Sequence, residues 1–144
     1  MANPHRSRLL TKGLAKGWRQ ALGPWVQDNV AANQAAVVIK VGATAAPQNE
    51  VVTPRAGSVT GITLSATVAP AGTDAVFTVT KNGSAISGCI LTVTAGATLG
   101  RSATFTPGTY PIAASDRLGV TVTTGAGWTA TTSDVAVCVE VETE

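Results

Sequence analysis

The chain has 144 residues, which is enough for one domain with a hydrophobic core. Aromatic residues make up 4% of it and charged residues only 12%, and its many threonines and valines favour β-strands. Two cysteines and one histidine are too few for a four-ligand zinc site, and no apolar run is long enough to cross a bilayer.

The charge of the chain is unevenly distributed. Residues 1–34 hold five basic residues against one acid, a net charge of +4, whereas residues 35–144 carry a net charge of −2. This asymmetry predicts a basic N-terminal arm that meets an acidic partner surface, and a solvated basic tail is the alternative. Three basic residues interrupt the apolar stretch between Leu9 and Leu22, so we do not expect a secretory signal there.

A short helix is predicted over residues 6–22, because apolar residues recur there at a spacing of four and Gly23-Pro24 follows. Two of the three tryptophans, Trp18 and Trp25, lie in this arm, and interfaces are enriched in tryptophan and arginine. The alternative is that both tryptophans pack back on the β domain. The predicted attachment residues are Arg6, Arg8, Leu10, Lys12, Leu14, Lys16, Trp18, Arg19, Leu22 and Trp25.

The rest of the chain is predicted to be all-β, with about eight antiparallel strands in a sandwich or closed barrel. Asn82-Gly83 predicts a type I′ hairpin turn. The strands are expected at residues 35–41, 51–52, 58–68, 75–80, 89–94, 101–106, 117–123 and 134–142. The core residues expected from alternation are Ile62, Leu64, Val68, Phe77, Val79, Leu91, Val93, Phe105, Leu118, Val120, Val122, Val137 and Val139.

The sequence offers few residues for catalysis. The single histidine is His5, close to the N-terminus, so we do not expect an acid–base site or triad built on histidine. Asp74 and Asp116 lie at strand starts, where aspartate is a common turn residue. Cys89 and Cys138 fall in different predicted strands and are expected to remain thiols, with a disulfide as the alternative. We therefore predict that the protein is not an enzyme and has no metal or cofactor.

Five segments within residues 57–142 follow one another in a recognisable order. They are Phe77-Thr-Val-Thr-Lys-Asn-Gly-Ser-Ala, Leu91-Thr-Val-Thr-Ala-Gly, Ser102-Ala-Thr-Phe-Thr, Ser115-Asp-Arg-Leu-Gly-Val-Thr-Val-Thr and the valine strand 135–141. This series resembles small jelly-roll virion proteins of tailed bacteriophages, namely capsid decoration (cement) proteins, head fibres and fibre tips. It is also similar to the trimeric tumour-necrosis-factor-like heads of collagen-like surface proteins, but residues 1–34 contain no Gly-x-y repeat.

The resemblance implies a jelly-roll-like β-sandwich at residues 35–144 and a structural role in a virion, after synthesis in the host cytoplasm. The implied partners are the major capsid protein, gripped by the arm of residues 1–34, and further copies of the chain, with a homotrimer expected. Nucleic acid and membranes are not expected as partners. The alternatives are a receptor- or glycan-binding knob of a phage fibre and a lectin-like carbohydrate-binding module, for which Trp128 would be the surface aromatic residue.

Overall fold

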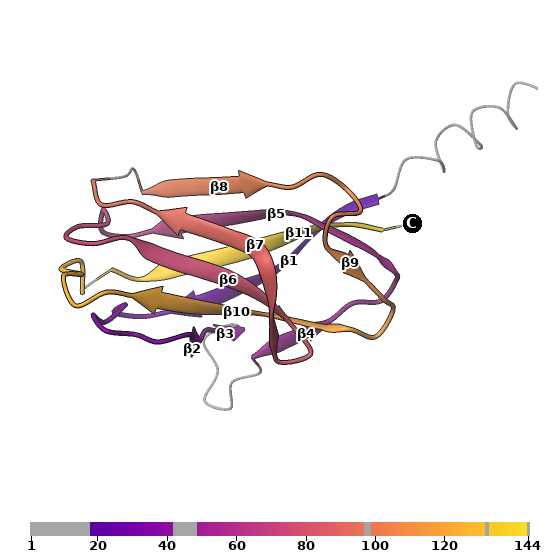
Figure 1. The fold of residues 1–144 in the computed structure, drawn as a ribbon, viewed down its shortest axis with the longest axis horizontal. Coiled ribbons are helices and arrows are strands. Elements are labelled where there is room, and N and C mark those ends of the chain that lie inside the picture. Colours follow the sequence, from indigo (N-terminus) through magenta and orange to yellow (C-terminus); the bar gives the residue numbers. More distant parts are fainter. Residues whose placement is uncertain (1–17, 42–48, 97–98, 132, 144) are drawn as a thin grey trace, which may run out of the picture.

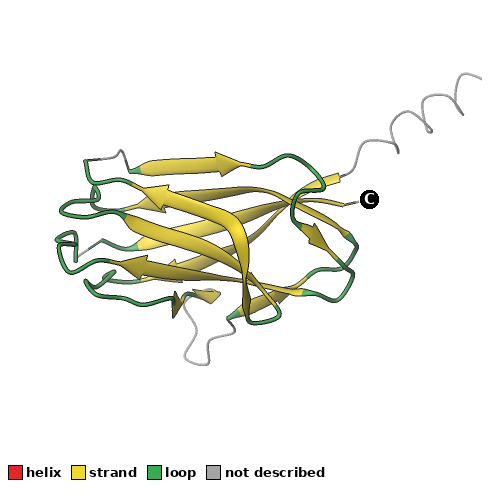
Figure 2. Ribbon diagram, in the orientation of Figure 1, coloured by secondary structure: helices red, strands yellow, loops and turns green. Residues whose placement is uncertain are grey.

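The computed structural model describes residues 18–41, 49–96, 99–131 and 133–143, and these residues form two antiparallel β-sheets and no helix (Figures 1 and 2). The all-β sandwich predicted from the sequence is therefore confirmed. The strands are β1 (Trp18–Gln27), β2 (Val37–Val38), β3 (Lys40–Val41), β4 (Glu50–Val52), β5 (Gly57–Ala66), β6 (Ala75–Lys81), β7 (Ser84–Val93), β8 (Gly100–Thr104), β9 (Pro111–Ile112), β10 (Arg117–Thr124) and β11 (Val135–Thr143).

The two sheets are built from nested strand pairs. The first, called the β1 sheet, has the order β3-β1-β11-β5-β8, with β9 beside β5. The second, called the β10 sheet, has the order β2-β10-β6-β7, with β4 beside β10. Thus β1 pairs with β11, β2 and β4 with β10, β5 with β8, and β6 with β7, all antiparallel. Among the described strands, the two-residue β3, which pairs with β1, departs from this nesting.

The last strand shows how the sequence produces this sandwich. The valines of β11 at 135, 137, 139 and 141 are buried, while the residues between them are partly exposed. Successive side chains of a strand point to opposite faces, and β-branched valine suits a pleated surface. The valine face of β11 therefore packs into the core, and the other face points outward, as the alternation predicts.

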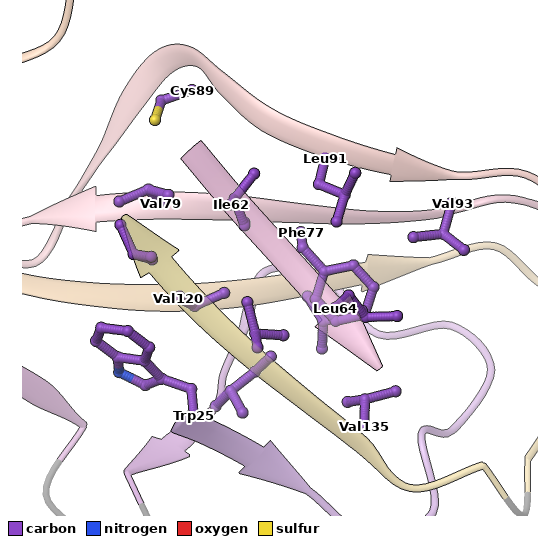
Figure 3. Close-up of a cluster of buried hydrophobic side chains, with 14 of the residues drawn as sticks. Trp25, Ile62, Leu64, Phe77, Val79, Cys89, Leu91, Val93, Val120 and Val135 are labelled. Atoms are coloured by element: carbon purple, nitrogen blue, oxygen red, sulfur yellow. The ribbon is translucent and has the colours of Figure 1, made fainter. Parts of the chain in front are cut away.

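The core lies between the two sheets, and about half of its buried hydrophobic residues were predicted from the sequence (Figure 3). All of the predicted core residues are buried except two. Val68 lies in the loop after β5 and is 38% exposed, and Phe105 is only partly buried against Tyr110, with ring centroids 5.0 Å apart. The hairpin prediction also holds, because Asn82 and Gly83 both have positive φ, 52° and 81°.

The structure differs from the prediction at residues 18–34. Residues 18–22 do not end a helix: they begin β1, which pairs with β11 along its length. The described sandwich therefore begins at Trp18 and not at residue 35. Trp18, Gln20 and Leu22 alternate with Arg19 and Ala21, as residues on one face of a strand do. Pairing of this segment with β11 outweighs its weak helical signal. The remainder of the predicted helix lies outside the described residues.

The apolar run at 35–41 was expected to be one strand, but it divides between the two sheets. Val37–Val38 pairs with β10, whereas Lys40–Val41 pairs with β1. Between them Ile39 is buried, and its N–H donates to the Val120 carbonyl at 2.9 Å. This crossing joins the β10 sheet to the β1 sheet at one side of the sandwich.

Candidate attachment surface

The ten predicted attachment residues do not share one surface. Trp18 and Arg19 are exposed at the start of β1. Leu22 and Trp25 are buried in the core, so the prediction that they contact a partner is wrong for the folded protein. The other six lie outside the described residues: Arg6, Arg8, Leu10, Lys12, Leu14 and Lys16.

Trp25 is a core residue of the sandwich (Figure 3). Its exposed fraction is 0%, and its indole N–H donates to the Asn49 carbonyl at 3.0 Å. Trp128 is buried in the same way, with its indole N–H donating to the Val30 carbonyl at 2.8 Å. Buried tryptophans usually satisfy the N–H in this manner. Trp25 therefore packs on the β domain, and Trp128 is not a surface aromatic.

Arg19 lies on the outer face of the β1 sheet and is held by two acids of β11. Its Nε donates to Glu142 Oε2 at 3.0 Å, and its Nη1 lies 3.5 Å from Glu140 Oε1. Glu140 also accepts a hydrogen bond from Thr60 Oγ1 at 2.9 Å. Such exposed pairs contribute only ~0–1 kcal/mol each to stability. They nevertheless balance the Arg19 charge, which is then less available to an acidic partner.

Trp18 stands beside a hollow at the end of the sandwich where β1 begins. Its exposed fraction is 72%, the highest among the large hydrophobic residues that are described. The hollow has a volume of about 380 Å³ and is lined by Trp18, Gln20, Pro54, Arg55 and Thr143. Arg55 is exposed and makes no ion pair within the described ranges. Sequence reasoning missed Arg55, because only the fold brings the segment after β4 to the start of β1.

A second hollow lies over the β10 sheet and contains one carboxylate. Its volume is about 370 Å³, and its lining includes Glu50, Thr80 and Thr121. Glu50 forms an ion pair with Arg117 at 3.1 Å and accepts the Gly83 N–H at 2.8 Å. The Glu50 carboxylate is therefore bound by Arg117 and by the Gly83 N–H, and no second acid lies beside it in the lining of the hollow.

The predicted turn role is confirmed for Asp116, whereas Asp74 binds the segment that follows β7. Asp74 accepts the Ala95 N–H at 3.2 Å. Asp116 accepts the Ala113 N–H and the Asn82 side-chain amide, both at 2.8 Å. These two donors hold the pKa of the Asp116 carboxyl below its usual value, with the backbone donor as the larger cause. Asp116 thus joins the turn before β10 to the Asn82-Gly83 hairpin.

The lowered pKa predicts a pH-dependent contribution of Asp116 to stability. A carboxyl whose pKa is lower in the folded state stabilises the fold above its unfolded pKa of about 3.9, and this contribution is lost as the pH falls through the folded pKa. Asp116→Asn should therefore lower Tm at pH 7, and the difference from the wild type should shrink in strong acid. Calorimetry across pH tests this, with Asp28→Asn as control. An equal Tm difference at every pH would contradict the carboxylate's role.

The two cysteines are free thiols, as expected, and the disulfide alternative is not realised. Cys89 is buried, and burial raises the pKa of its thiol to about 12, so it stays protonated at neutral pH. Within the described residues, no three His, Cys, Asp or Glu side chains are grouped to hold a metal ion. The same residues contain no helix that could span a membrane. His5 lies outside the described ranges.

Comparison with known proteins does not assign the chain to a family. No family model matches the sequence, and a search of curated proteins finds no relative.

Proposed function

We propose that the protein is a non-catalytic virion subunit that decorates and stabilises an assembled phage capsid. The observation that carries this proposal is the nested pairing of the strands. The two-residue β3 is left out of this nesting, because it pairs with β1. When β2 and β4 are taken as one position and β8 and β9 as another, β1 pairs with β11, β2 and β4 with β10, β5 with β8 and β9, and β6 with β7. This order supports a jelly roll, a fold used repeatedly in viral capsid and lectin domains.

The N-terminal end of the sandwich is the proposed attachment side. Residues 1–17 contain four basic residues and no acid, and they join the sandwich at the exposed Trp18. Basic charge steers a protein toward an acidic surface, and a desolvated aromatic side chain can then anchor the contact. With Leu22 and Trp25 in the core, Trp18 becomes the proposed aromatic anchor.

Self-association, with a homotrimer as the expected form, is the second part of the proposal. The outer face of the β10 sheet carries an uncharged row made by paired residues, Val38, Thr121, Thr78 and Ile90, of which Val38 and Ile90 are exposed. Burial of apolar area contributes roughly 25 cal/mol per Å². A row without charge can pack against the same row of a neighbouring copy without repulsion between like charges.

A receptor- or glycan-binding knob of a phage fibre is the second candidate. The exposed Trp18 beside a hollow is the observation that favours it, since an indole can cover the apolar face of a sugar. Trp128, which would have served a lectin-like module, is buried and gives this candidate no support.

Labelling of virions distinguishes the two candidates. Antibodies against the full chain, bound to purified particles of the phage that encodes it, are expected to decorate the capsid surface. Light scattering of the purified chain is expected to give a trimer. Label confined to the tail would favour the knob, and particles that lack the chain altogether would refute both candidates.

A further inference from the structure

The first strand has one edge that no described strand covers. On one side β1 pairs with β11 from Trp18 to Gln27. On its other side β3 pairs only with Trp25 and Val26, so no described strand pairs with the edge from Trp18 to Leu22. Exposed sheet edges are templates for pairing with another chain, and proteins usually cover or blunt them.

The features that usually prevent another strand from pairing with a sheet edge, proline and charged side chains, are weak here. Pro24 has no N–H to offer, but it lies beyond Leu22, where the register with β11 shifts. Arg19 is the charged residue on this stretch, and Glu140 and Glu142 hold it on the outer face of the sheet. Within the part of the chain that the structure describes, the edge from Trp18 to Leu22 is thus unpaired and open to an added strand.

The hollow described above lies beside this edge. Trp18 and Gln20 alternate with Arg19 and so point to the opposite face, where Pro54 and Arg55 complete the lining. The lining joins an exposed indole and a proline ring to an exposed guanidinium that has no acid partner among the described residues. A strand added at the edge would place every second side chain on the same face as the hollow.

The charge around the edge selects between possible occupants. Arg55 has no acid partner among the described residues, and four basic residues precede Trp18 in the sequence. A second copy would bring the same basic segment to the edge, so its approach would be opposed by like charge. An acidic extended segment of another protein is complementary.

We propose that the edge of β1 from Trp18 to Leu22 binds an extended acidic segment of a partner protein as an added strand. One apolar side chain of that segment packs on Trp18 and Pro54, and one carboxylate pairs with Arg55. Main-chain hydrogen bonds supply affinity in such complexes, and the hollow supplies specificity. This inference deepens the proposed function and depends on it in one respect, namely that the partner is the shell protein of the capsid.

The test uses the full chain and two capped synthetic peptides, Thr-Asp-Thr-Val-Thr-Glu-Thr, whose valine and two acids share one face of a strand, and the same sequence with lysine at the two acidic positions. Titration by tryptophan fluorescence and by amide hydrogen exchange is expected to show that the acidic peptide binds and slows exchange at residues 18–22. The lysine peptide is expected not to bind. Arg55→Glu and Trp18→Ala should each weaken binding about tenfold or more.

Matched variants keep the result specific. Lys40→Glu makes the same charge change on an exposed lysine outside the hollow, and Leu99→Ala removes an exposed apolar side chain elsewhere. Both should bind the acidic peptide like the wild type. If Arg55→Glu binds as well as Lys40→Glu, or if protection appears away from β1, the inference is wrong. Binding of a uronic-acid oligosaccharide in place of the peptide, or pairing of two copies at this edge, would also overturn it.

Failure of the inference and failure of the proposed function give different results. Virions that carry Trp18→Ala and Arg55→Glu chains at unchanged occupancy would leave capsid decoration standing and refute the β1 edge as the docking site. Peptide binding at β1, with no chain found in particles, would support the edge site and refute the capsid as its partner.

Discussion

Removal of residues 1–34 is expected to prevent the sandwich from folding, whereas removal of residues 1–17 is expected to leave it folded. The longer deletion takes away β1 together with three buried side chains, those of Leu22, Trp25 and Val30. Each such side chain contributes about 1.5–3 kcal/mol when fully buried, and a domain has only about 5–15 kcal/mol of net stability. The deletion also exposes β11, a central strand, as a sheet edge.

Circular dichroism and two-dimensional amide NMR of the two truncated chains, 18–144 and 35–144, check this expectation. The 18–144 chain should give dispersed amide signals and a cooperative thermal transition like that of the full chain. The 35–144 chain should aggregate or show collapsed signals. A well-folded 35–144 chain would mean that β1 is dispensable, and residues 1–34 would then form a separable arm after all.

Strands with strict alternation were predictable from the sequence because each one carries its own burial pattern. In β11 the valines alternate with more polar residues, and in β6 Phe77 and Val79 are buried beside partly exposed neighbours such as Val76. The Asn82-Gly83 turn was predictable for a similar reason, since its two residues tolerate positive φ. Local sequence and global fold agree at these positions.

The N-terminal strand was not predictable because its local signals conflict. In Trp18–Gln27 only Leu22 and Trp25 are buried, and a register shift separates them, so the two-residue period is broken where it would be recognised. The same stretch also fits the spacing of a helix. What fixes it as a strand is the partner β11, more than a hundred residues later in the chain. Tertiary pairing of this kind leaves little trace in local sequence.

The candidate site was even less predictable from the sequence than β1, because the fold alone brings its residues together. Charge asymmetry directed attention to the N-terminal residues, and Trp18 does lie on the surface. Pro54 and Arg55 lack any pattern that would link them to Trp18 in the sequence. They reach the hollow because the chain leaves β4 in one sheet and enters β5 in the other beside the start of β1. The unpaired edge is likewise a property of sheet order and not of composition.

Trp25→Ala is expected to lower the stability of the protein by about 3–5 kcal/mol, the usual range for truncating a buried tryptophan. The indole is fully buried between the sheets (Figure 3). Its loss leaves a cavity beside Val137, the residue that pairs with Trp25 on β11, and removes the hydrogen bond to the Asn49 carbonyl. For a chain of this length, such a loss corresponds to a fall in Tm of roughly 10 °C or more. Denaturant unfolding and calorimetry measure both quantities.

Trp18→Ala is the matched control, because it removes the same side chain from an exposed position on the same strand. Its effect on unfolding should stay within about 0.5 kcal/mol, as for most surface substitutions. Trp25→Phe should fall between the two, since a smaller ring keeps much of the packing and loses the indole N–H. The opposite pattern, with Trp25→Ala as stable as the wild type and Trp18→Ala strongly destabilised, would mean that the two tryptophans have exchanged roles. In that case Trp25, and not Trp18, would be the side chain free to anchor a partner.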